Sequence, residues 1–366
     1  MASTFGTNVR VSVFGQSHAP SVGVVMDGLP AGFAPDMEQL RAFMRRRAPG
    51  QSLLSTQRAE ADLFEVLSGL VDGKLCGAPL CMVIRNSDTR GQDYAGLKNT
   101  PRPGHADWPA QVKYRGHQDA AGGGHFSGRL TAPLCLAGGV MLQLLAQQGI
   151  RIGAHIAQIA DVQDTPFDPM APQLDALLDG HLRVLDEQAG QRMAAAIDAA
   201  RLAQDSVGGV VECAVTGLPV GVGQPMFDGL ENRIAQAVFA IPAVRGIAFG
   251  SGFDAAAMRG SQHNDEYALD VAGRVVTRTN RHGGVLGGLS TGMPLVFRAA
   301  FKPTASIFKP QRTVDIARGQ EAELMLKGRH DPCIVPRAVP VVEAVAAIAV
   351  YDLYLDYVKE QAYGVE

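Results

Sequence analysis

Glycine constrains the fold of this chain more than any other residue type, because 42 of its 366 residues are glycine, against an average usage of roughly 7%. Most of these glycines stand in short clusters, near residues 122, 208, 250, 283 and 287, and the clusters follow no fixed period. A collagen-like or solenoid fold is therefore excluded. Glycine adopts backbone conformations that other residues avoid, so the clusters predict tight loops that a ligand or a second stretch of backbone approaches closely.

The composition is that of a globular protein with a sizeable core. Hydrophobic residues make up 46% of the chain, aromatic residues 6% and charged residues 19%. With 33 Lys and Arg against 36 Asp and Glu, the net charge is −3, so the chain lacks the overall basic field of nucleic-acid and membrane binders. We expect neither kind of partner, and an anionic ligand must be met by a local group of cations.

Cysteine usage and the N-terminal residues predict a cytoplasmic location. The five cysteines are odd in number and lack metal-ligand spacing, which is typical of a reducing compartment, and we expect no bound metal. The first residues do not read as a basic and apolar leader. The uncharged stretch 130–150 is long enough to cross a bilayer, but it contains a proline, a glycine pair and three glutamines, so we interpret it as a buried helix.

Hydrophobic periodicity predicts strands and helices in no regular βαβ order, so we expect one interwoven α+β domain over residues 1–366. Strands are predicted at 9–14, 22–26, 209–215 and 295–301. Helices are predicted at 187–203, 231–239 and 340–358. A further helix should begin after Asp36, a suitable N-cap, and end in three arginines at the favourable end of the helix dipole.

Cations and hydroxyl groups stand beside glycine in several segments, at 102–107, 122–131, 283–292, 302–306 and 327–333. In the first, a Pro-Gly turn separates Arg102 from His105, and Asp107 is placed to orient the imidazole. In the second, the amides of three glycines can form an anion-binding nest ahead of a helix, although the spacing matches neither the Rossmann fingerprint nor the P-loop. The residues alone indicate an enzyme with a polyanionic ligand.

In their order along the chain, these segments resemble the chorismate synthase family. The loop 15–19 is similar to the family's Gly-Glu-Ser-His-Gly, and Arg-Pro-Gly-His-Ala-Asp stands intact at 102–107. Further matching segments are 250–253, 260–265, 279–292, 302–304, 328–337 and 343–344. The resemblance implies a β-α-β sandwich, usually a homotetramer, that converts 5-enolpyruvylshikimate 3-phosphate into chorismate and phosphate by anti-1,4-elimination, with reduced FMN.

The resemblance also implies roles for individual residues. His18 is expected to protonate the reduced flavin and His105 to assist phosphate departure, while Ser17 and Asp331 help with the C6 proton of the substrate. The substrate carries a phosphate and two carboxylates, and the arginines expected around it are Arg46, Arg47, Arg58, Arg102, Arg129, Arg329 and Arg337. The expected FMN contacts are His125, Phe126, Ser127, Pro242, Ala243, Gly287, Lys302, Pro303, Thr304, Ala305, Ser306 and Arg329.

The source of reducing equivalents is left open by the resemblance. The family includes members that reduce their own flavin with NADPH and members that depend on a separate flavin reductase. No Rossmann fingerprint decides between them here, and the bacterial-like length favours dependence on an outside reductant.

The main departure from the family lies in the middle motif, where many members read Asp-x-Arg-Gly-Gly-Gly-Arg-Ser-Ser-Ala-Arg-Glu-Thr. Here Ala121 and His125 replace two arginines, and Leu130 replaces the glutamate. These changes predict a divergent member with altered FMN contacts. The alternatives are a non-catalytic paralogue that binds flavin or a shikimate-type anion, and an ordinary flavin oxidoreductase.

Overall fold

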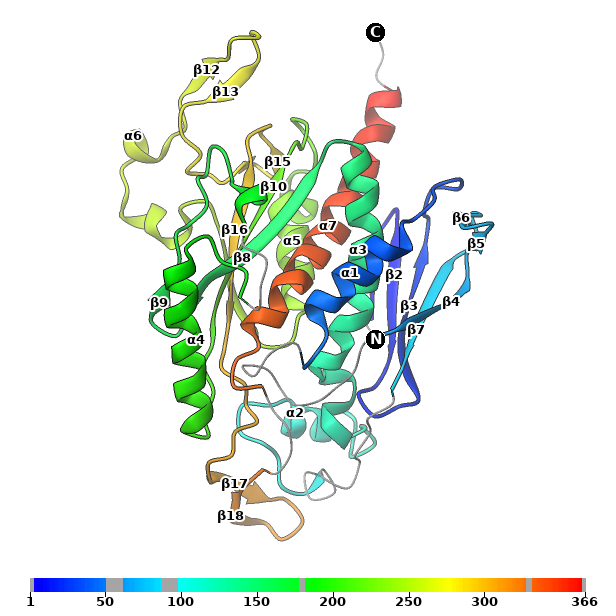
Figure 1. Cartoon of the computed structure of the whole chain (residues 1–366), viewed down its shortest axis with the longest axis vertical. Coiled ribbons are helices and arrows are strands. Elements are labelled where there is room, and N and C mark those ends of the chain that lie inside the picture. The colour runs from blue at the N-terminus through cyan, green and yellow to red at the C-terminus, as the bar shows by residue number, and fades with distance from the viewer. Residues whose placement is uncertain (1–2, 51–61, 87–97, 178–181, 327–330, 364–366) are drawn as a thin grey trace.

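The computed structural model describes residues 3–50, 62–86, 98–177, 182–326 and 331–363 (Figure 1). Two five-stranded antiparallel sheets dominate it. The first sheet has the order β1 (Thr4–Phe5), β2 (Arg10–Gly15), β3 (Ser21–Asp27), β7 (Leu80–Arg85), β4 (Phe64–Ser68). The second has the order β11 (Val244–Phe249), β16 (Leu295–Phe301), β10 (Gly209–Thr216), β8 (Arg151–Ile159), β9 (Val162–Gln163).

A helix layer lies between the two sheets (Figure 1). Helix α3 (Thr131–Gln147) packs on the first sheet, α7 (Val335–Tyr363) packs on the second, and the two helices pack on each other. Their close approach depends on Gly138, where a Cβ atom would lie 2.3 Å from the Cα atom of Ala344. The expected β-α-β sandwich is therefore confirmed.

The remaining elements surround this sandwich. The other helices are α1 (Met37–Arg47), α2 (Asp107–Lys113), α4 (Glu187–Leu202), α5 (Leu230–Phe239) and α6 (Gly260–His263). Four small hairpins are formed by β5 (Leu70–Val71) and β6 (Lys74–Leu75), β12 (Tyr267–Leu269) and β13 (Val275–Thr277), β14 (Val285–Leu286) and β15 (Leu289–Ser290), and β17 (Gln311–Asp315) and β18 (Gln320–Leu324). Short 3-10 turns are η2 (Ala121–Phe126), η3 (Gly128–Leu130), η4 (Leu174–Ala176), η5 (Met226–Asp228) and η6 (Gly252–Ala257).

Two helices in the described residues are long and apolar enough to span a membrane, but both belong to the core. In the segments 128–147 and 335–363, 78% and 89% of the apolar window is buried inside the fold. A helix that is apolar on all sides is stable inside a large core, because neighbouring elements cover every face. The interpretation of 130–150 as a buried helix is confirmed, although the helix ends at Gln147.

The predicted helix after Asp36 is confirmed in detail, since the Asp36 carboxylate accepts from two backbone N–H groups of the first turn of α1, each at 2.9 Å. The predicted start of the last helix at Pro340 is wrong. Helix α7 begins at Val335, with the N–H groups of Arg337 and Ala338 donating to the Ile334 carbonyl. One backbone hydrogen bond lost at Pro340 is outweighed by the apolar surface that the extra turn buries.

Candidate active site

Three consecutive glycines lie against both loops that carry the expected catalytic histidines. Gly122 and Gly123 have positive φ angles of 59° and 91°, which L side chains rarely adopt. A Cβ atom on Gly122 would lie 2.2 Å from His18 Cε1, and one on Gly123 would lie 3.0 Å from His105 Nε2. Since a side chain would collide with either imidazole, the glycines let one loop contact both.

Ser17 and His18 are fixed against this glycine loop. The Ser17 backbone N–H donates to the Gly124 carbonyl at 3.1 Å, and its buried hydroxyl donates to the Ala121 carbonyl at 2.8 Å. His18 Nδ1 lies 3.2 Å from the same hydroxyl oxygen. Because the single hydroxyl proton is directed at Ala121, Nδ1–H donates to the hydroxyl, which places the lone pair of a neutral His18 imidazole on Nε2.

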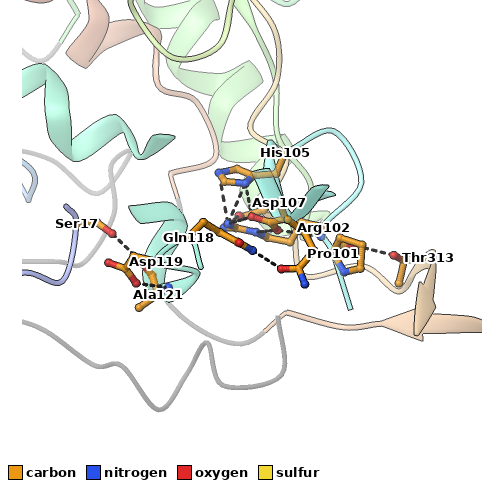
Figure 2. Close-up of polar contacts among 11 residues, drawn as sticks. Ser17, Pro101, Arg102, His105, Asp107, Gln118, Asp119, Ala121 and Thr313 are labelled. Carbon is orange, nitrogen blue, oxygen red and sulfur yellow. Dashed lines mark hydrogen bonds and ion pairs between the residues drawn. The ribbon is translucent and has the colours of Figure 1, made fainter. Parts of the chain in front are cut away.

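Arg102, His105 and Asp107 form a second cluster at the start of α2, drawn in Figure 2. Asp107 accepts from Arg102 Nε and Nη2, each at 2.8 Å, and its Oδ1 lies 2.5 Å from His105 Nδ1. An ionised carboxylate only accepts, so Nδ1–H donates to Asp107. Burial raises the pKa of Asp107, but the hydrogen bonds and charges of Arg102 and His105 outweigh it and hold this pKa well below its usual range. The prediction that Asp107 orients His105 is confirmed.

The segment that follows β16 reaches this second cluster. Ser306 Oγ accepts from Arg102 Nη1 at 3.3 Å. Lys302 Nζ lies 3.9 Å from the position of a Cβ atom on Gly104, and burial together with a neighbouring arginine charge lowers the pKa of Lys302. The structure therefore brings the 302–306 segment beside the Arg-Pro-Gly-His turn, although about 200 residues separate them in the chain.

Asp331 lies at the edge of the same region. The Thr304 hydroxyl donates to the Asp331 backbone carbonyl at 2.9 Å. The Asp331 carboxylate accepts from Arg337 Nη1 at 2.6 Å. Arg337, expected to contact substrate, therefore holds Asp331 in this structure.

Arg46 is engaged by a buried carboxylate on α7. Its Nη1 and Nη2 donate to the two carboxylate oxygens of Glu343 at 2.7 and 2.9 Å, and the same carboxylate accepts from the Ala154 backbone N–H at 2.9 Å. This bidentate pair joins α1 to α7 and to the second sheet. A substrate contact for Arg46 stays a prediction.

Arg47 and Arg129 share one carboxylate, that of Asp62, which the sequence did not single out. Arg47 Nη1 donates to one oxygen of Asp62 and Arg129 Nη1 donates to the other. The Asp62 side chain is fully buried. Charge balance was the one sequence signal that could have indicated this acid, because buried arginines need an acidic partner.

The expected flavin contacts around the glycine loop lie close to the first loop. His125 Nδ1–H donates to the Gly15 carbonyl at 2.8 Å, and His125 Nε2 lies 3.0 Å from Ser3 Oγ. Phe126 is 40% exposed, and Ser127 Oγ caps the next 3-10 turn. His125 thus ties the glycine loop to the end of β2.

The other expected flavin contacts are not all brought together. Pro242 and Ala243 lie beside Lys302, whose backbone N–H donates to the Ala243 carbonyl at 3.0 Å. Gly287 instead occupies the β14–β15 hairpin, near the start of β16, whereas Lys302 follows the end of that strand (Figure 1). Arg58 and Arg329 lie outside the described residues.

A cavity of about 530 Å³ lies apart from this cluster, beside α6 and the β12–β13 hairpin. Its lining residues are Ala257, Met258, Ser261, Gln262, Asn264, Glu266, Arg278, Thr279 and Arg281. None of them belongs to the expected site, so the cavity and the chemistry of the glycine loop are separate. In the described part of the chain, no group of three or more His, Cys, Asp or Glu is arranged to hold a metal ion.

A helix layer enclosed by two sheets, with two oriented histidines and several arginines around a glycine loop, defines an α+β enzyme for a multiply anionic substrate. The chorismate synthase family model matches residues 9–355. Curated chorismate synthases of Korarchaeum cryptofilum and Lancefieldella parvula are each 45% identical to this chain; the first alignment covers 95% of it and 96% of the relative, the second 99% and 98%.

A crystal structure of a chorismate synthase superposes with a TM-score of 0.75 at 27% identity, covering 96% of this chain and 93% of the other. The chain belongs to the chorismate synthase family. It is a lyase of the shikimate pathway, which leads to the aromatic amino acids.

Proposed function

We propose that the chain converts 5-enolpyruvylshikimate 3-phosphate into chorismate and phosphate, with reduced FMN bound beside the substrate. The observation that carries the proposal is the contact of one glycine loop with His18 and His105. In the elimination the bond between C3 and the phosphate oxygen breaks, phosphate leaves with the electron pair, and a proton leaves C6. The reaction therefore needs a cationic pocket and placed proton-transfer groups, and it has no net redox change.

The leaving phosphate is assigned to the cluster of Arg102, His105 and Asp107. Arg102 is held bidentately by Asp107, so its guanidinium keeps a fixed orientation toward an anion. His105 acts toward the phosphate through Nε2, because Nδ1–H donates to Asp107. The other arginines proposed to surround the phosphate and the two carboxylates are Arg46, Arg47, Arg58, Arg129, Arg329 and Arg337.

The residues proposed to hold FMN fit its chemistry. The Lys302 ammonium group and the Ser306 hydroxyl are donors for a phosphate, whereas Thr304, which donates to the Asp331 carbonyl, holds the segment in place. The positive φ angles of the glycine loop let a planar ring approach the backbone. Reduced FMN, when bound, supplies electron density to the substrate while the C–O bond breaks. Further proposed contacts are His125, Phe126, Ser127, Pro242, Ala243, Gly287, Pro303, Ala305 and Arg329, of which Gly287 rests on the resemblance alone.

Proton transfer is assigned to the first loop and to Asp331. His18 holds a proton at Nε2 or releases one there, while the Ser17 hydroxyl orients its ring. The Asp331 carboxylate, held by Arg337, assists removal of the C6 proton. The hydrogen bond from Arg337 fixes the position of this carboxylate.

The same proposal covers the context of the enzyme. The chain is proposed to act in the cytoplasm as one domain, within a homotetramer, without nucleic acid or membrane as partner. A separate flavin reductase is the proposed source of reduced FMN, and NADPH oxidation by the chain itself is the alternative.

The test is an anaerobic assay with purified protein, dithionite-reduced FMN and 5-enolpyruvylshikimate 3-phosphate, with phosphate release and chorismate absorbance followed together. Equal amounts of both products without flavin oxidation are expected. Flavin binding without product would favour the non-catalytic paralogue and implicate the altered positions Ala121, His125 and Leu130. NAD(P)H consumption in proportion to product would indicate an ordinary flavin oxidoreductase.

A further inference from the structure

We infer that Asp62 is a positioning residue for the proposed reaction, on which this inference rests: it fixes Arg47 and Arg129 relative to each other, and through them the loops that carry the proposed catalytic groups. Asp62 lies just before β4, and its two carboxylate oxygens are divided between the two arginines. The Arg47 and Arg129 side chains are only 3% and 4% exposed. Three segments distant in the chain therefore meet at one carboxylate.

Charge explains why this position needs an acid. Two guanidinium groups that approach each other inside a protein repel strongly, because the surroundings screen little. Burial raises the pKa of Asp62, but the charges and hydrogen bonds of Arg47 and Arg129 outweigh it, so the pKa is lowered and the group is ionised at neutral pH. The three groups sum to +1, so the cluster keeps a positive field for an anionic substrate while the two cations stay in place.

On one side, the cluster of Asp62, Arg47 and Arg129 is hydrogen-bonded through Asn86 to the loop 15–19, which carries Ser17 and His18. Arg129 Nε donates to the side-chain oxygen of Asn86 at 3.0 Å. The Asn86 amide donates to the Ala19 carbonyl at 2.7 Å and to the Gln16 carbonyl at 3.3 Å. These two carbonyls bracket Ser17 and His18, so a shift of Arg129 moves the loop that orients both side chains.

On the other side the cluster reaches Asp331. Arg47 Nε donates to Thr131 Oγ1 at 3.2 Å, which holds its guanidinium against the start of α3. The Arg47 backbone carbonyl accepts from Arg337 Nε at 3.1 Å, and Arg337 Nη1 donates to Asp331. Asp62 thus stands between the two proposed proton-transfer groups without being placed against either.

The test compares Asp62→Asn and Asp62→Glu with the parent and with the matched control Asp352→Asn. Asp352 is a buried acid on α7 that pairs with Arg233 Nη2 at 3.0 Å, outside the proposed machinery. Measurements are the binding of 5-enolpyruvylshikimate 3-phosphate by calorimetry, KM and kcat in the anaerobic assay, and thermal melting. A double variant of Asp62→Asn with Arg47→Met completes a cycle with the single variants.

For Asp62→Asn we expect substrate binding and KM to worsen by about 10- to 100-fold, the scale of one charge-assisted hydrogen bond. Asp62→Glu should recover part of the loss, and the double variant should bind no worse than Arg47→Met alone. Asp352→Asn should lower the melting temperature while leaving KM unchanged.

Parent-like binding and KM in Asp62→Asn, with a fall in melting temperature like that of the control, would overturn the positioning role. If Asp62→Asn does not fold, Asp62→Glu decides: parent-like binding and KM there would also overturn it. The proposed function fails separately, through absence of turnover in the parent, whereas the binding comparison needs no turnover.

Discussion

The hydrogen bonds of Asp107 make Asp107→Asn an informative substitution. The carboxylate accepts from the backbone N–H, Nε and Nη2 of Arg102 and from Nδ1 of His105. An asparagine keeps one accepting oxygen and turns an NH₂ group toward the remaining donors. Two charge-assisted hydrogen bonds are lost at roughly 1.5–3 kcal/mol each, so the free energy of unfolding should fall by about 3–6 kcal/mol. For a chain of this length, that corresponds to about 4–8 °C in melting temperature.

The catalytic effect of the same substitution should be separable from its effect on stability. Without the carboxylate, the proton of His105 is no longer held on Nδ1. The Nε2 atom that faces the leaving phosphate then no longer has a fixed protonation. We expect kcat to fall about 10²–10³-fold, which is about 2.7–4 kcal/mol in the barrier. The assay is anaerobic phosphate release with reduced FMN. Asp164→Asn is the control. Asp164 also pairs with a histidine, with 2.9 Å between Asp164 Oδ2 and His155 Nδ1, but this pair does not belong to the glycine loop.

The pH dependence of stability gives an independent check. Because the folded pKa of Asp107 is depressed, its stabilisation is present above the unfolded value near 3.9 and is lost as the pH falls through the folded value. The parent should therefore lose more stability below pH 4 than Asp107→Asn does. The role assigned to this carboxylate would be refuted if Asp107→Asn had the kcat of the parent and also lost as much stability below pH 4 as the parent does.

Three further predictions concern other parts of the site and of the sheet. Gly122→Ala should lower kcat at least tenfold, because its Cβ atom would lie 2.2 Å from an imidazole; Gly128→Ala, whose Cβ atom meets nothing within 4 Å, should keep parent activity. His125→Arg should tighten FMN binding, measured by fluorescence quenching, and an unchanged affinity would mean that another group has replaced the arginine of other family members. Burial lowers the pKa of His155, but the hydrogen bonds and charges of its two carboxylate partners outweigh burial, so this pKa is raised. The stabilisation that these ion pairs give to the folded state should therefore fade as the pH rises through the folded pKa, above about 6.5. Urea unfolding of His155→Gln should lack that alkaline loss, and a parent-like pH profile would contradict the assignment.

Local signals predicted the long helices and the strands β2, β3, β10 and β16, but they predicted none of β4, β7, β8 and β11, which complete the two sheets. The Asp36 cap and the arginines of its last turn define α1, and the strand predicted at 295–301 coincides with β16. The start of α7 was predicted wrongly from hydrophobic periodicity, since the helix begins at Val335 and Pro340 lies inside it. At this position the burial of the apolar helix between the two sheets outweighs the low helix propensity of proline.

The sequence by itself determined the family, the order of the motifs and the residue types available for binding an anion and moving protons. It also pointed to the partnership of His105 with Asp107, because two residues of separation keep them within one turn. Only the tertiary structure decided which acids meet the arginines. Arg46 pairs with Glu343, 297 residues away, and Asp62 stands between Arg47 and Arg129. The physical reason is that burial of a charge requires a partner in space, and spatial proximity between distant segments is set by the packing of the two sheets on the helix layer.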